Sequence, residues 1–281
     1  MTVTLPAPAK LNLFLHVTGR RVDGYHTLET AFQLLDYGDL LDFRWENGEG
    51  FSLACDLPGL NTDDNLITRA AALLAPHRRL ARKVHVTLHK RLPLGGGVGG
   101  GSSDAATTLL ALNALWGCGF TSPQLARLGL ALGADVPVFV AGYSAFARGV
   151  GEELEPLVLP TRWYLVLTPP CHSETRTIFG HPELTRQSAP LKIRGFPFSG
   201  TRNDCEPVAC RLYPAIGEAL AWLGHHAPAR MTGTGASVFA AFASKPEAQA
   251  VQAQLPPSWR SFVAQGVNQS AVPALAAALP T

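Results

Sequence analysis

The sequence lacks the features that mark a membrane protein or a domain held together by metal ions or disulfides. No uncharged apolar run reaches the length of about 18 residues that a transmembrane helix needs. The five cysteines form no C-x-x-C pair, which indicates neither a zinc site nor a disulfide framework. The first ten residues carry neither the charged region nor the apolar core of a signal peptide. We therefore expect a cytoplasmic protein with no membrane partner.

Charge is also scarce. Only 16% of the 281 residues are charged and the net charge is +2, which gives no indication of nucleic-acid binding. The basic residues that cluster between Arg78 and Arg91 are interpreted as a solvated face. The length suits one large or two medium domains, and we expect one domain over residues 1–158 and another over residues 159–281.

What the sequence does contain is a run of six glycines among the seven residues 95–101. The run lies between an alternating, strand-like stretch at residues 83–90 and an apolar, helix-like stretch that ends at Gly117. Glycine allows left-handed backbone and a close approach of a ligand to the main chain. The start of the following helix adds free N–H groups and the positive end of its dipole. This stretch therefore predicts an anion site, most often one for phosphate.

Two further absences exclude the commonest phosphate loops. No lysine follows any of these glycines, so the run is not a Walker A loop. The run does satisfy G-x-G-x-x-G, but a dinucleotide-binding fold also needs an acidic residue about 20 residues further on. Between Ala105 and Ala134 there is no Asp or Glu. A dehydrogenase is therefore not indicated.

Other polar residues keep two interpretations open. Lys10 and Asn12 share one face of a predicted strand, which is either a cleft wall or the wet face of an edge strand. Asp135 precedes a proline, where it is either a helix N-cap or a base near the phosphate loop. Tyr25 and His26 follow a polar turn, and they either pack within the loop or contact a nucleobase. The pattern alone does not decide between these alternatives.

Local patterns also predict secondary structure. Residues 27–45 predict strands with a turn at the Gly-Asp pair of residues 38–39. One of residues 102–104, two serines and an aspartate, is expected to cap the helix after the glycine run. Residues 206–223 predict a single helix.

Three motifs, met in the same order along the chain, resemble those of the GHMP kinases. They are Pro8–Leu13 (PAKLNL), Pro93–Ala106 (PLGGGVGGGSSDAA) and Met231–Phe239 (MTGTGASVF). The resemblance implies an α+β fold of two domains, each a mostly antiparallel sheet with helices packed on it. It also implies an active site in the cleft between the domains, with the N-terminal domain binding ATP.

The stretches at residues 20–26, 133–137 and 203–208 are similar to one group within that family. Members of this group phosphorylate a hydroxyl of a cytidine diphosphate derivative of methylerythritol, in the non-mevalonate route of isoprene biosynthesis. The resemblance implies ATP and Mg²⁺ as cofactors and a small-molecule substrate, with no nucleic-acid partner. We expect a monomer or a weak homodimer. A kinase of the homoserine or mevalonate type and a non-catalytic nucleotide-binding protein remain as alternatives.

The resemblance also implies roles for single residues. Asp135 matches the general base and Lys10 the lysine beside it, which keeps the carboxylate ionised and steadies charge on the phosphoryl group. Tyr25 and Phe179 are expected to sandwich the cytosine, and His26 to choose it by hydrogen bonds. Asn12 and Thr175 match further residues that contact the substrate.

The expected ATP site follows from the second motif. Ser102 or Ser103 could also serve the magnesium ion, whose other protein ligands the sequence does not identify. The residues that match the ATP site are Pro93, Leu94, Gly95, Gly96, Gly97, Val98, Gly99, Gly100, Gly101, Ser102 and Ser103, with Asn65 and Leu66 at the adenosine end.

Overall fold

The structure is a computed structural model that describes residues 2–22, 24–57, 59–60, 63–191, 198 and 200–280. Within these residues, ten β-strands and nine α-helices form a mixed α+β fold, as predicted. The strands are β1 (Thr2–Arg20), β2 (His26–Asn47), β3 (Phe51–Cys55), β4 (Arg82–His89), β5 (Ala145–Arg148), β6 (Glu153–Pro156), β7 (Trp163–Thr168), β8 (Ala229–Met231), β9 (Val238–Phe242) and β10 (Arg260–Val267).

One hydrogen-bonded sheet connects the two parts of the chain, in the strand order β3-β4-β2-β10-β7-β9-β8. β1 and β5 pair with β2 outside this path, and β6 pairs with β5. β10 makes the connection, because it pairs with β2 at one end and with β7 along its length. All pairings are antiparallel except that of β3 with β4, which confirms the predicted antiparallel character.

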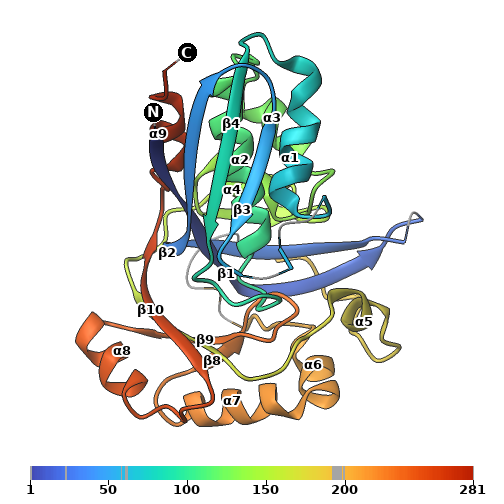
Figure 1. The fold of residues 1–281 in the computed structure, drawn as a ribbon. Helices are drawn as coiled ribbons and strands as arrows, with labels where there is room; N and C mark the ends of the chain where they lie inside the picture. Colours follow the sequence, from blue (N-terminus) through green and yellow to red (C-terminus); the bar gives the residue numbers. More distant parts are fainter. Residues whose placement is uncertain are drawn as a thin grey trace.

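The helices cover each part of the sheet separately (Figure 1). One core packs the first four helices against β1, β2, β4 and β5, with Trp116 as its largest fully buried side chain. A second core packs later helices against β7 and β9. No helix among the residues that the structure describes is long and apolar enough to cross a membrane. The helices are α1 (Leu66–Leu74), α2 (Gly100–Leu115), α3 (Ser122–Gly129), α4 (Val136–Ala141), α5 (Thr175–Gly180), α6 (Glu206–Leu212), α7 (Pro214–Gly224), α8 (Lys245–Gln252) and α9 (Val272–Ala277), with a short 3-10 helix at Ala75–His77.

The end of the chain returns to the first core. Val272, Ala276 and Leu279 from α9 and its flank are buried in the same cluster as Leu5 of β1. Figure 1 shows α9 beside the beginning of β1, so both termini lie on the N-terminal part of the molecule. The domain boundary after residue 158 stays a prediction. α9 lies after that boundary in the sequence but packs in the core of the N-terminal part.

The predicted turn at residues 38–39 is wrong, because β2 runs through it without interruption. At Gly38, β1 lies so close to β2 that an added Cβ would be 2.0 Å from the carbonyl oxygen of Ala7. Asp39 is fully buried, and its Oδ1 accepts hydrogen bonds from the backbone N–H groups of Arg91 (2.6 Å) and Leu92 (2.8 Å). The Gly-Asp pair therefore anchors the segment that leads into the glycine loop, which we define as residues 93–99.

Two helix predictions also need correction. The helix after the glycine loop begins at Gly100, and its N-cap is Gly99 with φ at +77° rather than one of residues 102–104. The single helix predicted over residues 206–223 is divided into α6 and α7. The division falls at Pro214, which has no N–H to continue the hydrogen bonding of α6.

The close approach at Gly38 generates a stability prediction. We expect Gly38→Ala to lower the free energy of unfolding by about 3 kcal/mol, because the added methyl group collides with backbone that cannot rotate away. Gly224→Ala is the control, since a Cβ at this exposed helix end meets nothing within 4 Å. Urea denaturation of both variants measures the difference, and equal stability of the two would contradict the packing described here.

Candidate active site

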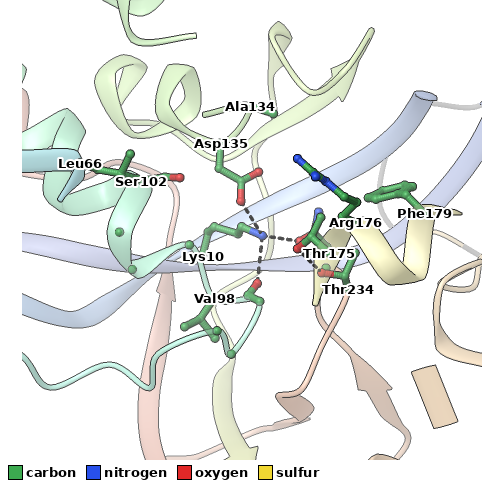
Figure 2. Close-up of a pocket in the computed structure, with 18 of the residues that line it drawn as sticks. Lys10, Leu66, Val98, Ser102, Ala134, Asp135, Thr175, Arg176, Phe179 and Thr234 are labelled. Carbon is green, nitrogen blue, oxygen red and sulfur yellow. Dashed lines mark hydrogen bonds and ion pairs between the residues drawn. The ribbon is translucent and has the colours of Figure 1, made fainter. Parts of the chain in front are cut away.

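A cavity of about 1040 Å³ lies between the two parts of the molecule. Its walls come from β1, β2, the glycine loop, the beginning of α2, α5 and the turn at residues 232–237 between β8 and β9. Figure 2 shows the centre of this cavity. Ser103 is the one predicted site residue that is not in the wall, because its side chain is fully buried. The predicted residues that do line the cavity are Lys10, Asn12, Tyr25, His26, Asn65, Leu66, Pro93, Leu94, Gly95, Gly96, Gly97, Val98, Gly99, Gly100, Gly101, Ser102, Asp135, Thr175 and Phe179.

The buried ammonium group of Lys10 is at the centre of the site. Its Nζ lies 3.1 Å from Oδ2 of Asp135 and donates hydrogen bonds to Oδ1 of Asn12 (2.6 Å) and to the carbonyl oxygen of Gly97 (3.0 Å). Lys10 is only 2% exposed, so its charge depends on these acceptors in place of water. One side chain thus joins β1, the glycine loop and the residue before α4 (Figure 2).

The conformation of β1 places Lys10 and Asn12 in the wall. The pairing of β1 with β2 shifts register between Pro8 and Lys10 and again between Asn12 and Leu15, and such irregularities re-aim side chains. Asn12 is 2% exposed and its Nδ2 donates to Oγ1 of Thr30 at 2.9 Å. The interpretation of this face as the wet side of an edge strand is therefore wrong.

Asp135 occupies the N-cap position of α4 but does not act as a side-chain cap. Its side chain makes no capping hydrogen bond and is 31% exposed in the cavity wall. The carboxylate is instead turned toward Lys10 (Figure 2). The structure therefore favours the second interpretation of Asp135, a carboxylate near the phosphate loop, over the helix cap.

The glycine loop takes a backbone path that other residues would block. Gly95, Gly97 and Gly99 have φ angles of +64°, +71° and +77°, a region that side chains disfavour. A Cβ on Gly97 would also lie 2.4 Å from the carbonyl oxygen of Thr232. Alternating left-handed residues of this kind form a concave nest of N–H groups that binds anions.

The carbonyl groups of residues 95–98 all accept hydrogen bonds from other segments of the chain. Ala236 and Ser237 donate backbone hydrogen bonds to the first two of them, at 3.3 and 3.1 Å. Lys10 donates to the other two, from its ammonium group and from its backbone N–H. These bonds hold the backbone of the loop between β1 and the turn at residues 232–237.

The three residues predicted to hold the base lie at one end of the cavity. His26 and Phe179 stack on each other with ring centroids 5.2 Å apart and an interplanar angle of 23°. His26 therefore covers one face of the phenyl ring, and a base could stack only on the other. Tyr25 lines the same end of the cavity and is 64% exposed. Burial and the positive charge of Arg186 lower the pKa of His26.

Several cavity residues were missed by the sequence reasoning. Thr234 shares a hydrogen bond of 2.9 Å with Thr175 through their hydroxyl groups, which ties α5 to the turn at residues 232–237. Arg176 also lines the cavity, and in Figure 2 it extends from α5 next to Phe179. Arg20 and Arg186 line it as well. The third motif indicated Thr234, but nothing in the local sequence distinguishes these arginines from surface residues.

The predicted adenosine end carries one structural constraint. The side chain of Asn65 accepts a hydrogen bond from the N–H of Ile67 (2.9 Å) and donates one to the carbonyl oxygen of Leu60 (2.7 Å). It therefore caps α1 and holds the preceding loop. Leu66 provides apolar surface at the same end of the cavity.

A buried charge cluster supports the start of α2. Lys90 forms ion pairs with Asp39 and with Asp104, the latter at 3.1 Å, and all three side chains are at most 4% exposed. Burial raises the pKa of Asp104. For Lys90, burial lowers the pKa but the two carboxylates raise it further, with a net shift upward. The prediction of a solvated basic face is thus wrong for Lys90, which fixes β2 and α2 on either side of the glycine loop.

Comparison with known families identifies two matching regions. The model of the GHMP kinases N-terminal domain matches residues 65–143, and that of the GHMP kinases C-terminal domain matches residues 196–260. A 4-diphosphocytidyl-2-C-methyl-D-erythritol kinase of Nitrosococcus oceani is 53% identical, over 94% of this chain and 95% of that protein. A kinase of the same name from Aromatoleum aromaticum is 54% identical, over 94% of this chain and 93% of that protein.

Solved structures agree with these matches. A crystal structure of 4-(cytidine 5'-diphospho)-2C-methyl-D-erythritol kinase superposes with a TM-score of 0.82 at 33% identity, covering 94% of this chain and all of that one. The mevalonate kinase of Methanococcus jannaschii superposes with a TM-score of 0.67 at 12% identity, over 95% of this chain and 98% of that one. The second likeness concerns the fold alone.

The buried cluster generates a second stability prediction. We expect Lys90→Met to lower the free energy of unfolding by about 3–5 kcal/mol, because two buried carboxylates then face each other without a cation. The loss should be smaller at pH 5 than at pH 8, since the raised pKa of Asp104 lets its carboxyl group bind a proton in the folded state, and stability then falls as pH rises.

Lys83→Met is the matched control. Lys83 pairs with Glu46 at 3.4 Å, but both side chains are exposed by 43% and 60%, so we expect a loss below about 1 kcal/mol. Chemical denaturation at the two pH values measures both variants. A Lys90→Met loss no larger than that of the control would show that the cluster does not stabilise the site.

Proposed function

The chain belongs to the GHMP kinase family, and we propose that it transfers the γ-phosphoryl group of ATP to a hydroxyl of 4-diphosphocytidyl-2-C-methyl-D-erythritol. The observation that carries this proposal is the pair of Lys10 and Asp135 held against the carbonyl oxygen of Gly97. Such an arrangement places a carboxylate and a cation beside a phosphate-binding loop. The full-length similarity to kinases named for this substrate supports the choice of acceptor.

The glycine loop and the beginning of α2 suit the triphosphate of ATP. The loop presents its N–H groups in a nest that a side chain would fill, and the N-terminus of α2 adds the positive end of a helix dipole. We assign the triphosphate to this loop and the adenosine to the side of Asn65 and Leu66. Both assignments use residues that line one continuous cavity.

Asp135 is the proposed general base. As the hydroxyl oxygen of the acceptor bonds to the γ-phosphorus and the bridge between the β- and γ-phosphates breaks, the hydroxyl proton passes to the Asp135 carboxylate. Lys10 pairs with that carboxylate at 3.1 Å and lies close enough to stabilise charge on the transferred group. Holding the two reactants in line can contribute about 7–11 kcal/mol to lowering the barrier.

The nucleotide end of the acceptor is assigned to Tyr25, His26 and Phe179. Stacking on an aromatic ring contributes about 1–3 kcal/mol per base but does not distinguish one base from another. Hydrogen bonds to the base edge must therefore provide the choice, and we assign this role to His26. Asn12 accepts a hydrogen bond from Lys10, and Thr175 lies on α5 with Phe179, so we assign these two residues to the middle of the substrate.

Magnesium would enter with ATP. Among the residues that the structure describes, no group of three or more His, Cys, Asp or Glu side chains is arranged to hold a metal ion. Ser102 faces the cavity, whereas the buried hydroxyl of Ser103 has no access to it. The donor set thus fits an ion held mainly by phosphate oxygens and water, with Ser102 as the one hydroxyl candidate. When bound, the ion would neutralise charge on the phosphates.

A coupled assay of ADP release tests the proposal directly. With Mg-ATP, we expect turnover with 4-diphosphocytidyl-2-C-methyl-D-erythritol and not with homoserine or mevalonate. Equal turnover with either of those alcohols would overturn the choice of substrate, and a complete lack of turnover would favour a nucleotide-binding protein without catalysis. A cytoplasmic location and a monomeric or weakly dimeric state stay predictions.

Replacing the proposed base tests its role. We expect Asp135→Asn to lower kcat by at least about 100-fold while the affinity for ATP is unchanged, because the amide cannot accept the hydroxyl proton. Steady-state kinetics and ATP titration measure the two effects separately. Asp42→Asn is the control, since Asp42 lies on β2 outside the cavity wall and pairs with His89 at 2.9 Å. Full activity of Asp135→Asn would remove Asp135 from the reaction.

A further inference from the structure

A single arginine connects the two stacked rings at the base-binding end of the cavity. The Nε–H of Arg186 donates to Nε2 of His26 at 3.1 Å. Its two terminal nitrogens donate to four backbone carbonyl groups in the segment that carries Phe179. The four carbonyl oxygens belong to Phe179 (3.0 Å), His181 (2.7 Å), Leu184 (3.2 Å) and Pro182 (3.4 Å).

These bonds use the whole guanidinium group, which offers five donors in a fixed plane. Four of them close the segment from residue 179 to residue 184 around the arginine. The fifth reaches across to His26 at the beginning of β2. The orientation of the imidazole is therefore tied to that of Phe179, on which it stacks.

The bond to His26 also determines where the imidazole carries its proton. A guanidinium group only donates, so Nε2 of His26 must present a lone pair to it. The neutral ring then carries its hydrogen on Nδ1, the remaining polar atom that it can offer to a ligand. A protonated ring would also carry a hydrogen on Nε2, and that N–H group would point at the Nε–H group of Arg186. Burial, Arg186 and Arg20 all lower the pKa of His26, in agreement with a neutral ring.

We propose that Arg186 is a positioning residue that holds His26 as the Nδ1–H tautomer and thereby makes the cavity select cytosine over uracil. At the edge where the two bases differ, cytosine presents the lone pair of its N3, whereas uracil presents an N3–H group. An Nδ1–H donor complements the first and opposes the second. This inference rests on the proposed function, because it takes a pyrimidine nucleotide as the substrate.

The first arm of the test needs no substrate. Nitrogen-15 NMR of the full chain labelled at histidine reports which ring nitrogen carries hydrogen, and His26→Gln identifies the signals of His26 among the nine histidines. At neutral pH we expect the Nδ1–H tautomer in the wild-type protein. An Nε2–H tautomer in the wild-type spectrum would overturn the proposal even if no variant of Arg186 folds.

Two variants separate the hydrogen bond from the charge. Arg186→Gln removes the fixed donor fork, and we expect it to release His26 to a mixture of tautomers and to raise the pKa of His26. Arg20→Gln removes a nearby positive charge that acts on the His26 ring through space, and we expect the Nδ1–H tautomer to persist in it. The same tautomer in both variants would overturn the assignment to Arg186.

The second arm measures base selection. We expect the ratio of kcat/KM for the cytidine substrate to that for its uridine counterpart to fall at least about tenfold in Arg186→Gln, since a donor is no longer fixed against N3. Arg186→Lys keeps the charge without the planar fork and should also lose selectivity. An unchanged ratio in Arg186→Gln, with the tautomer altered, would overturn the role in selection.

The two arms also distinguish this inference from the proposed function. A lack of turnover with both nucleotides would contradict the kinase activity, while the NMR spectrum would still decide the tautomer. Turnover with the cytidine substrate together with an Nε2–H ring would leave the kinase assignment in place and reject the role of Arg186.

Discussion

The arrangement of the site depends on the compensation of one buried positive charge. The ammonium group of Lys10 is removed from water and contacts three acceptors from three separate segments: Asn12 on β1, the carbonyl oxygen of Gly97, and Asp135. A buried ion that loses a partner is costly, so the three segments are held together by the charge that they share. The distance between the phosphate-binding loop and the proposed base is therefore set by the fold.

The glycine loop depends on both parts of the molecule. On its N-terminal side, the cluster of Lys90 with Asp39 and Asp104 fixes the strand that leads into the loop and the helix that follows it. On the other side, the turn at residues 232–237 donates two hydrogen bonds to the loop carbonyls. The glycine loop is thus held by contacts from both parts of the molecule. This explains why the cavity lies where β10 connects the two parts.

Local patterns in the sequence predicted local features well. The strand-like stretch at residues 83–90 forms β4, and the helix-like stretch that ends at Gly117 forms α2. The alternation at residues 83–90 places Val84, Val86 and Leu88 inward on β4. In each case the signal and the structure that it predicts lie within one element. The quoted motifs and stretches likewise contain the predicted residues that line the cavity, except Asn65, Leu66, Thr175 and Phe179.

Features that depend on distant contacts were not predictable in this way. The Gly-Asp pair at residues 38–39 has the composition of a turn. In the structure Gly38 instead allows β1 to approach closely, and the Asp39 carboxylate holds the backbone before the glycine loop. Lys90 is part of a basic stretch, and only the fold places two carboxylates against it. Arg186 has no motif, because its partners are backbone carbonyl groups and one ring nitrogen of a residue 160 positions earlier.

The most direct measurement of the central claim is phosphorus-31 NMR of the reaction mixture with Mg-ATP and 4-diphosphocytidyl-2-C-methyl-D-erythritol. A site that joins Lys10, Asp135 and the glycine loop in one cavity should transfer phosphate to a carbon-bound hydroxyl. The account predicts a new phosphomonoester resonance that grows in step with ADP, while the diphosphate resonances of the substrate remain. Release of inorganic phosphate without this monoester, or loss of the substrate diphosphate, would contradict it.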